Sequence, residues 1–221
     1  MITVHHLNNS RSQRILWMLE ELELDYEIKH YQRDAVTNLA PSTLKLIHPL
    51  GKSPVLTDGD ITVAESGAII EYLATTYGNG RLLPKAGTEA QRQCSYWLHF
   101  AEGSLMPPMV AKLVFDKVRA NAKPFFVKII ANKIADKVMG GYFGPNILAN
   151  MQFIEAHLGH NAWFAGDELS GADFQMSFPL EAAVAKGAAM QYPNIGAFVK
   201  KVHSRPAYKK ALSKGGQYDY A

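Results

Sequence analysis

Residues 2–31, ITVHHLNNSRSQRILWMLEELELDYEIKHY, contain the clearest secondary-structure pattern of the chain. The first part of this stretch, Ile2 to Leu7, is a short extended run, and the polar cluster after it leads into a helical repeat of apolar residues from Ile15 to Leu22. Tyr26 to Tyr31 then alternates like a second strand. The stretch therefore predicts strand, loop, helix and strand, which is how a small α/β domain begins.

The following segments extend this pattern. Pro41 to Leu46 reads as a short helix, and Ser53 to Thr57 and Ile61 to Ala64 read as strands joined by the two-residue hairpin signal Asp58-Gly59. Ser66 to Tyr77 completes the order β-α-β-α-β-β-α, which predicts a mixed sheet. A Gly- and Pro-rich segment, 78–87, follows, and beyond it only helical periodicity persists. We therefore expect an α/β domain at residues 1–83 and an all-helical domain at residues 88–221.

Composition excludes several classes of protein. The net charge of the 221 residues is only +3 and no long run of like charge occurs, so we expect no nucleic-acid partner. The single Cys94 cannot form an intrachain disulfide and favours a reducing compartment. No signal segment or long apolar stretch is present, so we expect a cytoplasmic protein without membrane contact. The histidines show no ligand spacing, and we expect no metal.

Four segments together resemble the glutathione transferase superfamily, and they are similar to a group of its fungal and bacterial enzymes. They are HHLNNSRSQRILWMLEELELDYE (5–27), HPLGKSPVL (48–56), AESGAIIEYL (64–73) and SGADFQMSFPL (170–180). The resemblance implies a thioredoxin-like domain followed by a helical domain, and glutathione as co-substrate. It also implies a cytosolic homodimer that conjugates glutathione to small hydrophobic electrophiles in detoxification.

In the loop Gly51 to Val55, the resemblance implies a cis Ser53–Pro54 bond and pairing of the Ser53 backbone with the cysteinyl amide of glutathione. Lys52 is then expected to meet a glutathione carboxylate. The residues by themselves are also consistent with an edge-strand proline beside a solvated lysine.

The Glu65-Ser66 pair stands at the start of a helix, where free N–H groups and the helix dipole favour anions. By resemblance, Ser66 binds the γ-glutamyl carboxylate of glutathione and Glu65 its amino group. The plainer interpretation is that Ser66 caps the helix.

The turn from Asn8 to Arg11 lies where the superfamily keeps its thiol-activating residue. Ser10 is the predicted catalytic hydroxyl, with Asn9 or Ser12 as alternatives because the alignment can slide in this loop. By resemblance, Asn9 is also expected to bind glutathione. A simple helix cap without a catalytic role is also consistent with this turn. No cysteine lies nearby, which argues against the classes that form mixed disulfides.

In the helical part, Glu102 precedes an apolar face with Leu105, Met106, Met109 and Leu113, interrupted at Met106 by Pro107-Pro108. By resemblance this helix lines the electrophile pocket and the dimer interface, although such a stripe is also typical of a core. An unpaired carboxylate on this face is costly. From this cost and from the resemblance together, we expect Glu102 to reach the γ-glutamyl amine bound by the partner chain. Ser170 and Asp173 predict a capping box for a helix from Ala172 to Lys186.

Three functions are consistent with these features. The first is transfer of glutathione to electrophilic carbon, and the second is a glutathione-dependent peroxidase or disulfide reductase that uses the same thiolate. The third is a non-enzymatic interaction module. Retention of Ser10, Lys52, Glu65 and Ser66 argues against the third function, because an interaction module needs no tripeptide site. The sequence does not name the electrophile.

Overall fold

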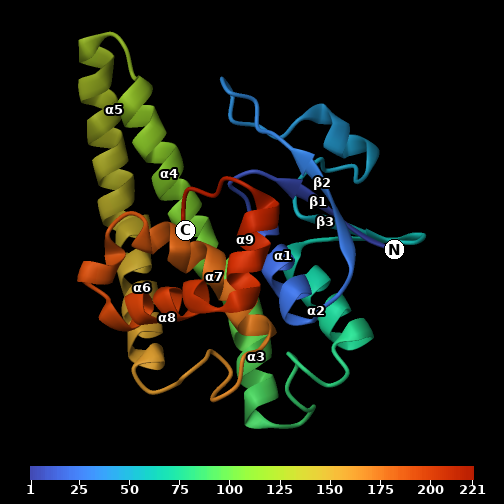
Figure 1. Cartoon of the computed structure of the whole chain (residues 1–221). Helices are drawn as coiled ribbons and strands as arrows, with labels where there is room; N and C mark the ends of the chain where they lie inside the picture. Colours follow the sequence, from blue (N-terminus) through green and yellow to red (C-terminus); the bar gives the residue numbers. More distant parts are fainter.

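The computed structural model describes residues 1–221 and has a sheet with helices on one side and a larger group of helices beside it (Figure 1). The sheet order is β2-β1-β3-β4, formed by β1 (Ile2–Leu7), β2 (Tyr26–Tyr31), β3 (Val55–Asp58) and β4 (Ile61–Ala64). β1 is parallel to β2 and antiparallel to β3, which is antiparallel to β4. The predicted mixed sheet is confirmed.

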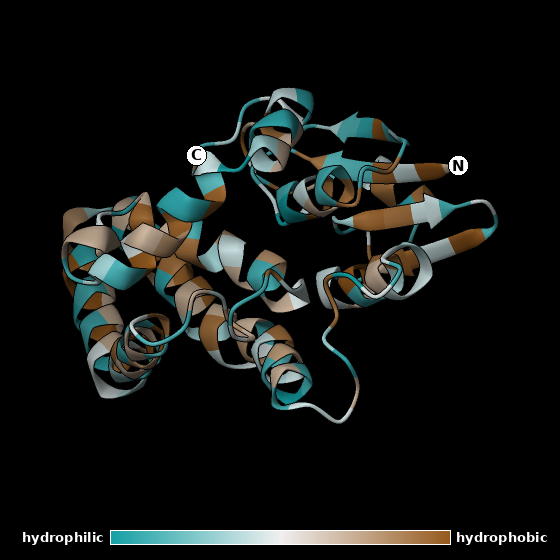
Figure 2. Cartoon of the chain, turned by 60° about the horizontal axis from the view of Figure 1, so that its bottom comes forward, coloured by the Kyte–Doolittle hydropathy of each residue, from teal (hydrophilic) through white to brown (hydrophobic).

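Helix α1 (Ser12–Glu21) is buried on nearly all sides, because it lies between the sheet and helices of the second part of the chain. It contacts β1 and α2 (Ser66–Tyr77) within the first part, and α7 (Gly171–Val184) and α9 (Pro206–Gly215) of the second. Trp17, for example, is fully buried against the rings of Phe174 and Tyr208. One apolar core of buried residues therefore joins the two parts of the chain. Figure 2 shows hydrophobic stretches, in brown, on the strands of the sheet and on the helices of the second part.

The hairpin turn lies one residue later than predicted. Asp58 pairs with Ile61 inside the β3–β4 ladder, so the turn is Gly59-Asp60 and not Asp58-Gly59. Gly59 takes the first turn position with a φ of +57°, which a residue without a Cβ accepts at no steric cost. Asp58 is kept in the strand by hydrogen bonds that its carboxylate accepts from Tyr72 and Tyr77.

The second part is helical throughout, as predicted. The first part also contains a short 3₁₀ helix, η1 (Ser42–Leu46). The elements of the second part are α3 (Glu89–Phe100), η2 (Ala101–Leu105), α4 (Met106–Asn121), α5 (Phe125–Val138), η3 (Met139–Phe143), α6 (Gly144–Leu158), α7 (Gly171–Val184), η4 (Ala188–Met190), α8 (Pro193–Ser204) and α9 (Pro206–Gly215). The π-helical turn η2 ends at Leu105, so Pro107 and Pro108 lie in the first turn of α4, where a missing N–H costs little. None of these helices combines the length and apolar character needed to cross a bilayer.

The predicted capping box is confirmed at the start of α7, which begins at Gly171. The Asp173 carboxylate accepts hydrogen bonds from the backbone N–H of Ser170 at 2.8 Å and of Phe164 at 2.9 Å. Asp173 therefore fixes both the helix start and the loop before it. The helix ends at Val184, two residues before the predicted end.

Candidate functional site

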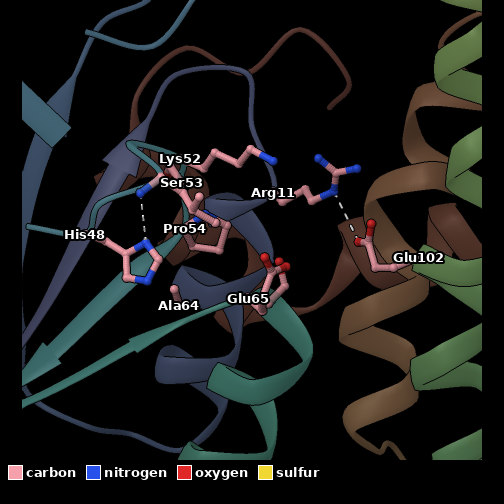
Figure 3. A pocket seen from close by; sticks show the side chains of 10 residues that line it. Arg11, His48, Lys52, Ser53, Pro54, Ala64, Glu65 and Glu102 are labelled. Atoms are coloured by element: carbon pink, nitrogen blue, oxygen red, sulfur yellow. Dashed lines mark hydrogen bonds and ion pairs between the residues drawn. The ribbon is translucent and has the colours of Figure 1, made fainter. Parts of the chain in front are cut away.

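A cavity of about 190 Å³ lies at the amino end of α2, where the two parts of the chain face each other (Figure 3). Its lining residues come from the β1–α1 loop, the loop before β3, the start of α2 and the turn η2. They are Arg11, His48, Leu50, Lys52, Ser53, Pro54, Ala64, Glu65, Ser66 and Glu102. All the predicted glutathione-binding residues except Asn9 are therefore brought together in one place.

The Ser53–Pro54 bond is cis, as the resemblance implied. The loop is held against the end of β1 because the Ser53 hydroxyl donates to the His5 carbonyl at 2.8 Å and accepts from the Leu7 N–H at 3.3 Å. These contacts place the backbone of Ser53 at the cavity wall. Lys52, next to it, points toward the side of the cavity where Arg11 lies (Figure 3).

The start of α2 differs from the predicted serine cap. Glu65, with a φ of +71°, occupies the N-cap position, and Ser66 is the first helical residue. The buried Ser66 hydroxyl accepts a hydrogen bond from Arg14 at 3.1 Å, and no side chain caps the helix. The first N–H groups of α2 consequently have no side-chain cap, and Glu65 and Ser66 at this helix end line the cavity, as an anion site requires.

Glu102 is paired within its own chain. Its Oε1 lies 2.6 Å from Nη2 of the fully buried Arg14 and 3.1 Å from Nε of Arg11. Burial by itself would raise the pKa of Glu102, but these two guanidinium groups lower it overall. Glu102 therefore finds ionic partners in its own chain, and its contact with the γ-glutamyl amine bound by a partner chain stays a prediction. The arginines that pair with it precede it by 88 and 91 residues in the sequence.

The predicted thiol-activating residues do not line the cavity. Ser10 is buried, and its hydroxyl accepts from the Ser12 N–H at 3.2 Å and lies 2.8 Å from the Ser12 hydroxyl. Asn9 lines a different cavity, and its side chain bonds to Asp219 of the C-terminal tail. The catalytic assignment of Ser10 stays a prediction.

Arg11, His48, Leu50 and Ala64 also line the cavity, and none of the four was predicted from the sequence. One signal was present: two arginines, Arg11 and Arg14, stand at the start of a helix, where the dipole disfavours cations. Such a placement indicates that the cations serve a partner outside the helix. Here the partner is Glu102.

The residues of the methionine-rich face of η2 and α4 have different surroundings, because some are buried in the core and others are exposed or line a cavity. Leu105 and Met106 are buried, whereas Leu113 is 43% exposed. Met109 lines a second cavity of about 680 Å³ between α4, α6 and the segment after α7, and this cavity shares no lining residue with the first. The interpretation of this face as an electrophile pocket stays a prediction.

Comparison with known proteins gives one consistent result. The family model for the glutathione S-transferase N-terminal domain matches residues 1–75, and the model for the C-terminal domain matches residues 145–206. Glutathione S-transferase 3 of Schizosaccharomyces pombe is 39% identical over 97% of this chain and 88% of its own length. Glutathione S-transferase 1 of Saccharomyces cerevisiae is 36% identical over 97% and 95%. The crystal structure of a glutathione S-transferase from Actinobacillus pleuropneumoniae superposes with a TM-score of 0.82 at 35% identity, covering 100% of this chain and 95% of that one.

Proposed function

Because the chain belongs to the glutathione S-transferase family, we propose that the cavity at α2 binds glutathione and that the enzyme transfers its thiolate to small hydrophobic electrophiles. Lys52 and the Ser53–Pro54 backbone bind the glycyl and cysteinyl parts of the tripeptide. Ser66 and the amino end of α2 bind the γ-glutamyl carboxylate. Glu65 and Glu102 bind the γ-glutamyl amine.

The observation that carries this proposal is the match of charges. Glutathione at neutral pH has two carboxylates and one ammonium group. The cavity offers the cation Lys52 and an uncapped helix start for the two carboxylates, and the carboxylates of Glu65 and Glu102 for the ammonium group. Each charged group of the tripeptide therefore has an opposite partner, and hydrogen bonds that involve charge are the stronger ones.

The electrophile is proposed to enter beside Arg11, where the chain supplies an apolar ring. Phe178 lies under the Arg11 guanidinium at 5.6 Å and meets Tyr220 edge-on, with 5.7 Å between ring centroids. Aromatic surface of this kind favours flat hydrophobic substrates. Conjugation of such compounds is a detoxifying activity, and we propose that it takes place in the cytoplasm.

We also propose a homodimer formed by the hairpin of α4 and α5, which extends beyond the other helices (Figure 1). Apolar side chains recur on these neighbouring helices at helical spacing and are exposed: Val110, Leu113, Val114 and Val118 on α4, and Phe126, Ile129, Ile130 and Ile134 on α5. Because one chain leaves this face uncovered, a second copy that buries it stabilises both.

Calorimetric titration with glutathione tests the proposed site. The wild-type protein is expected to bind, and Lys52→Ala to bind at least several-fold more weakly. Lys85→Ala, which removes a lysine outside the cavity, serves as the matched control. Failure of the wild type to bind millimolar glutathione would refute the proposed site. Assays with a haloaromatic compound and with a hydroperoxide then measure transfer against peroxidase activity.

A further inference from the structure

We infer that the Arg11 guanidinium contacts the sulfur of bound glutathione and stabilises it as the thiolate. The inference rests on the proposed function, because it concerns the ligand proposed for the cavity at α2. It assigns to Arg11 a role that the sequence analysis gave to Ser10.

Arg11 is positioned at the cavity wall. In the β1–α1 loop and the first turn of α1, Arg11 is the one residue that lines the cavity. It lies across from Ser53 and Pro54, at which the cysteine of the tripeptide is proposed to lie (Figure 3). Asn8 and Asn9 open onto a separate cavity on the other side of the loop.

The Ser10 hydroxyl belongs to a chain of buried hydrogen bonds that leads through Ser12 to His6. The Ser12 hydroxyl lies 2.8 Å from Nδ1 of His6, and burial together with His30 lowers the pKa of His6 to about 4, so this imidazole is neutral at neutral pH. The Leu7 carbonyl, 3.2 Å away, is a second acceptor for the Ser12 proton. When either of these acceptors takes that proton, the Ser12 oxygen accepts from the Ser10 hydroxyl at 2.8 Å. The Ser10 proton then points into the protein and is not offered to a thiolate.

Asn9, the other alternative, is also engaged. Its Nδ2 donates to the Asp219 carboxylate at 2.7 Å, and its Oδ1 accepts from the Asp219 N–H at 2.9 Å. The amide therefore holds the C-terminal tail. Its donor and its acceptor both face away from the cavity at α2.

The Arg11 side chain, by contrast, is fixed in position and still has free N–H donors on its guanidinium group. Its Nε donates to Glu102, and its guanidinium lies over the ring of Phe178. Neither Nη group has a hydrogen-bond partner within the chain. Because Glu102 is shared with Arg14, the two arginines and one carboxylate leave a net positive charge beside the cavity. A cation at this range lowers the pKa of an acid by about 1–3 units.

The test compares Arg11→Gln, Arg11→Lys, Ser10→Ala and the control Arg92→Gln, which removes an exposed arginine of α3. The pKa of bound glutathione is followed as thiolate absorbance against pH. We expect Arg11→Gln to raise this pKa by roughly one unit or more, which lowers the thiolate fraction about tenfold per unit at pH values well below both pKa values. Arg11→Lys keeps the charge and is expected to recover most of the shift. Ser10→Ala and Arg92→Gln are expected to leave the pKa unchanged.

Binding of S-methylglutathione, which has no ionisable thiol, separates a sulfur contact from a carboxylate contact. We expect Arg11→Gln to bind this analogue as the wild type does. An equal loss of affinity for the analogue and for glutathione would show that Arg11 anchors a carboxylate and would overturn the inference. So would an unchanged thiol pKa in an Arg11→Gln protein that still binds glutathione. If the wild type binds neither compound, the proposed function itself has failed.

Discussion

Replacement of Glu102 by Gln tests the ion-pair cluster that joins α1 to the helical domain. The substitution keeps the shape of the side chain and removes its charge, which leaves Arg14 as a buried cation without an ionic partner. Loss of one partner costs about 3–5 kcal/mol in a fully buried pair and about 0–1 kcal/mol in an exposed pair. The Arg14 side chain is 0% exposed and that of Glu102 is 34% exposed. We therefore place the loss between these limits, at about 2 kcal/mol of unfolding free energy.

Thermal unfolding at one fixed protein concentration measures this loss, since association with a second chain shifts the melting temperature. For a chain of this length, about 2 kcal/mol lowers Tm by roughly 4–8 °C. The matched control is Asp116→Asn, which breaks an exposed pair with Lys112 at 2.6 Å on α4. Its expected shift is within about 2 °C.

The pH dependence gives an independent check. The arginines lower the folded-state pKa of Glu102 from its ordinary value of 4.5, so the pair stabilises the protein above about pH 4.5. This stabilisation is lost as the pH falls through the lowered folded-state value. The difference in Tm between wild type and Glu102→Gln is therefore expected to shrink in acid. Equal melting of Glu102→Gln and Asp116→Asn at neutral pH would refute the reasoning.

Three further predictions concern anchoring, acid stability and assembly. Lys52→Ala and Ser66→Ala are expected to raise KM for glutathione and leave kcat nearly intact, because these contacts are equally strong in the ground and transition states. Steady-state kinetics measure both constants, and a collapse of kcat at constant KM would contradict the prediction. Glu20 is buried and its carboxylate bonds to Lys210 at 2.6 Å and to Lys214 at 2.5 Å. These bonds outweigh its burial and lower its pKa. Glu20→Gln is therefore expected to lower Tm above pH 4.5 and to melt like the wild type in stronger acid. Ile130→Glu on the exposed face of α5 is expected to give monomers by light scattering, whereas Lys137→Glu on the same helix is expected to remain dimeric.

The local elements of this protein could be predicted from its amino-acid sequence. The periodicity of residues 2–31 predicted β1, α1 and β2 correctly, and Ser170 with Asp173 predicted the start of α7. These features depend on residues close together in the chain, whose spacing fixes the hydrogen bonds of a helix, strand or cap. Membership of the family followed from the order of four such segments.

The residue of the β1–α1 loop that lines the cavity could not be predicted from the sequence, because it depends on tertiary packing. Sequence favours Ser10 because a hydroxyl at this place suits a thiolate, yet the packing of the helix start buries it against Ser12 and His6. The structure also pairs Glu102 with Arg11 and Arg14, which lie 91 and 88 residues away. Such contacts depend on how α1 packs against η2, and no local pattern records the distance between two elements that meet only after folding.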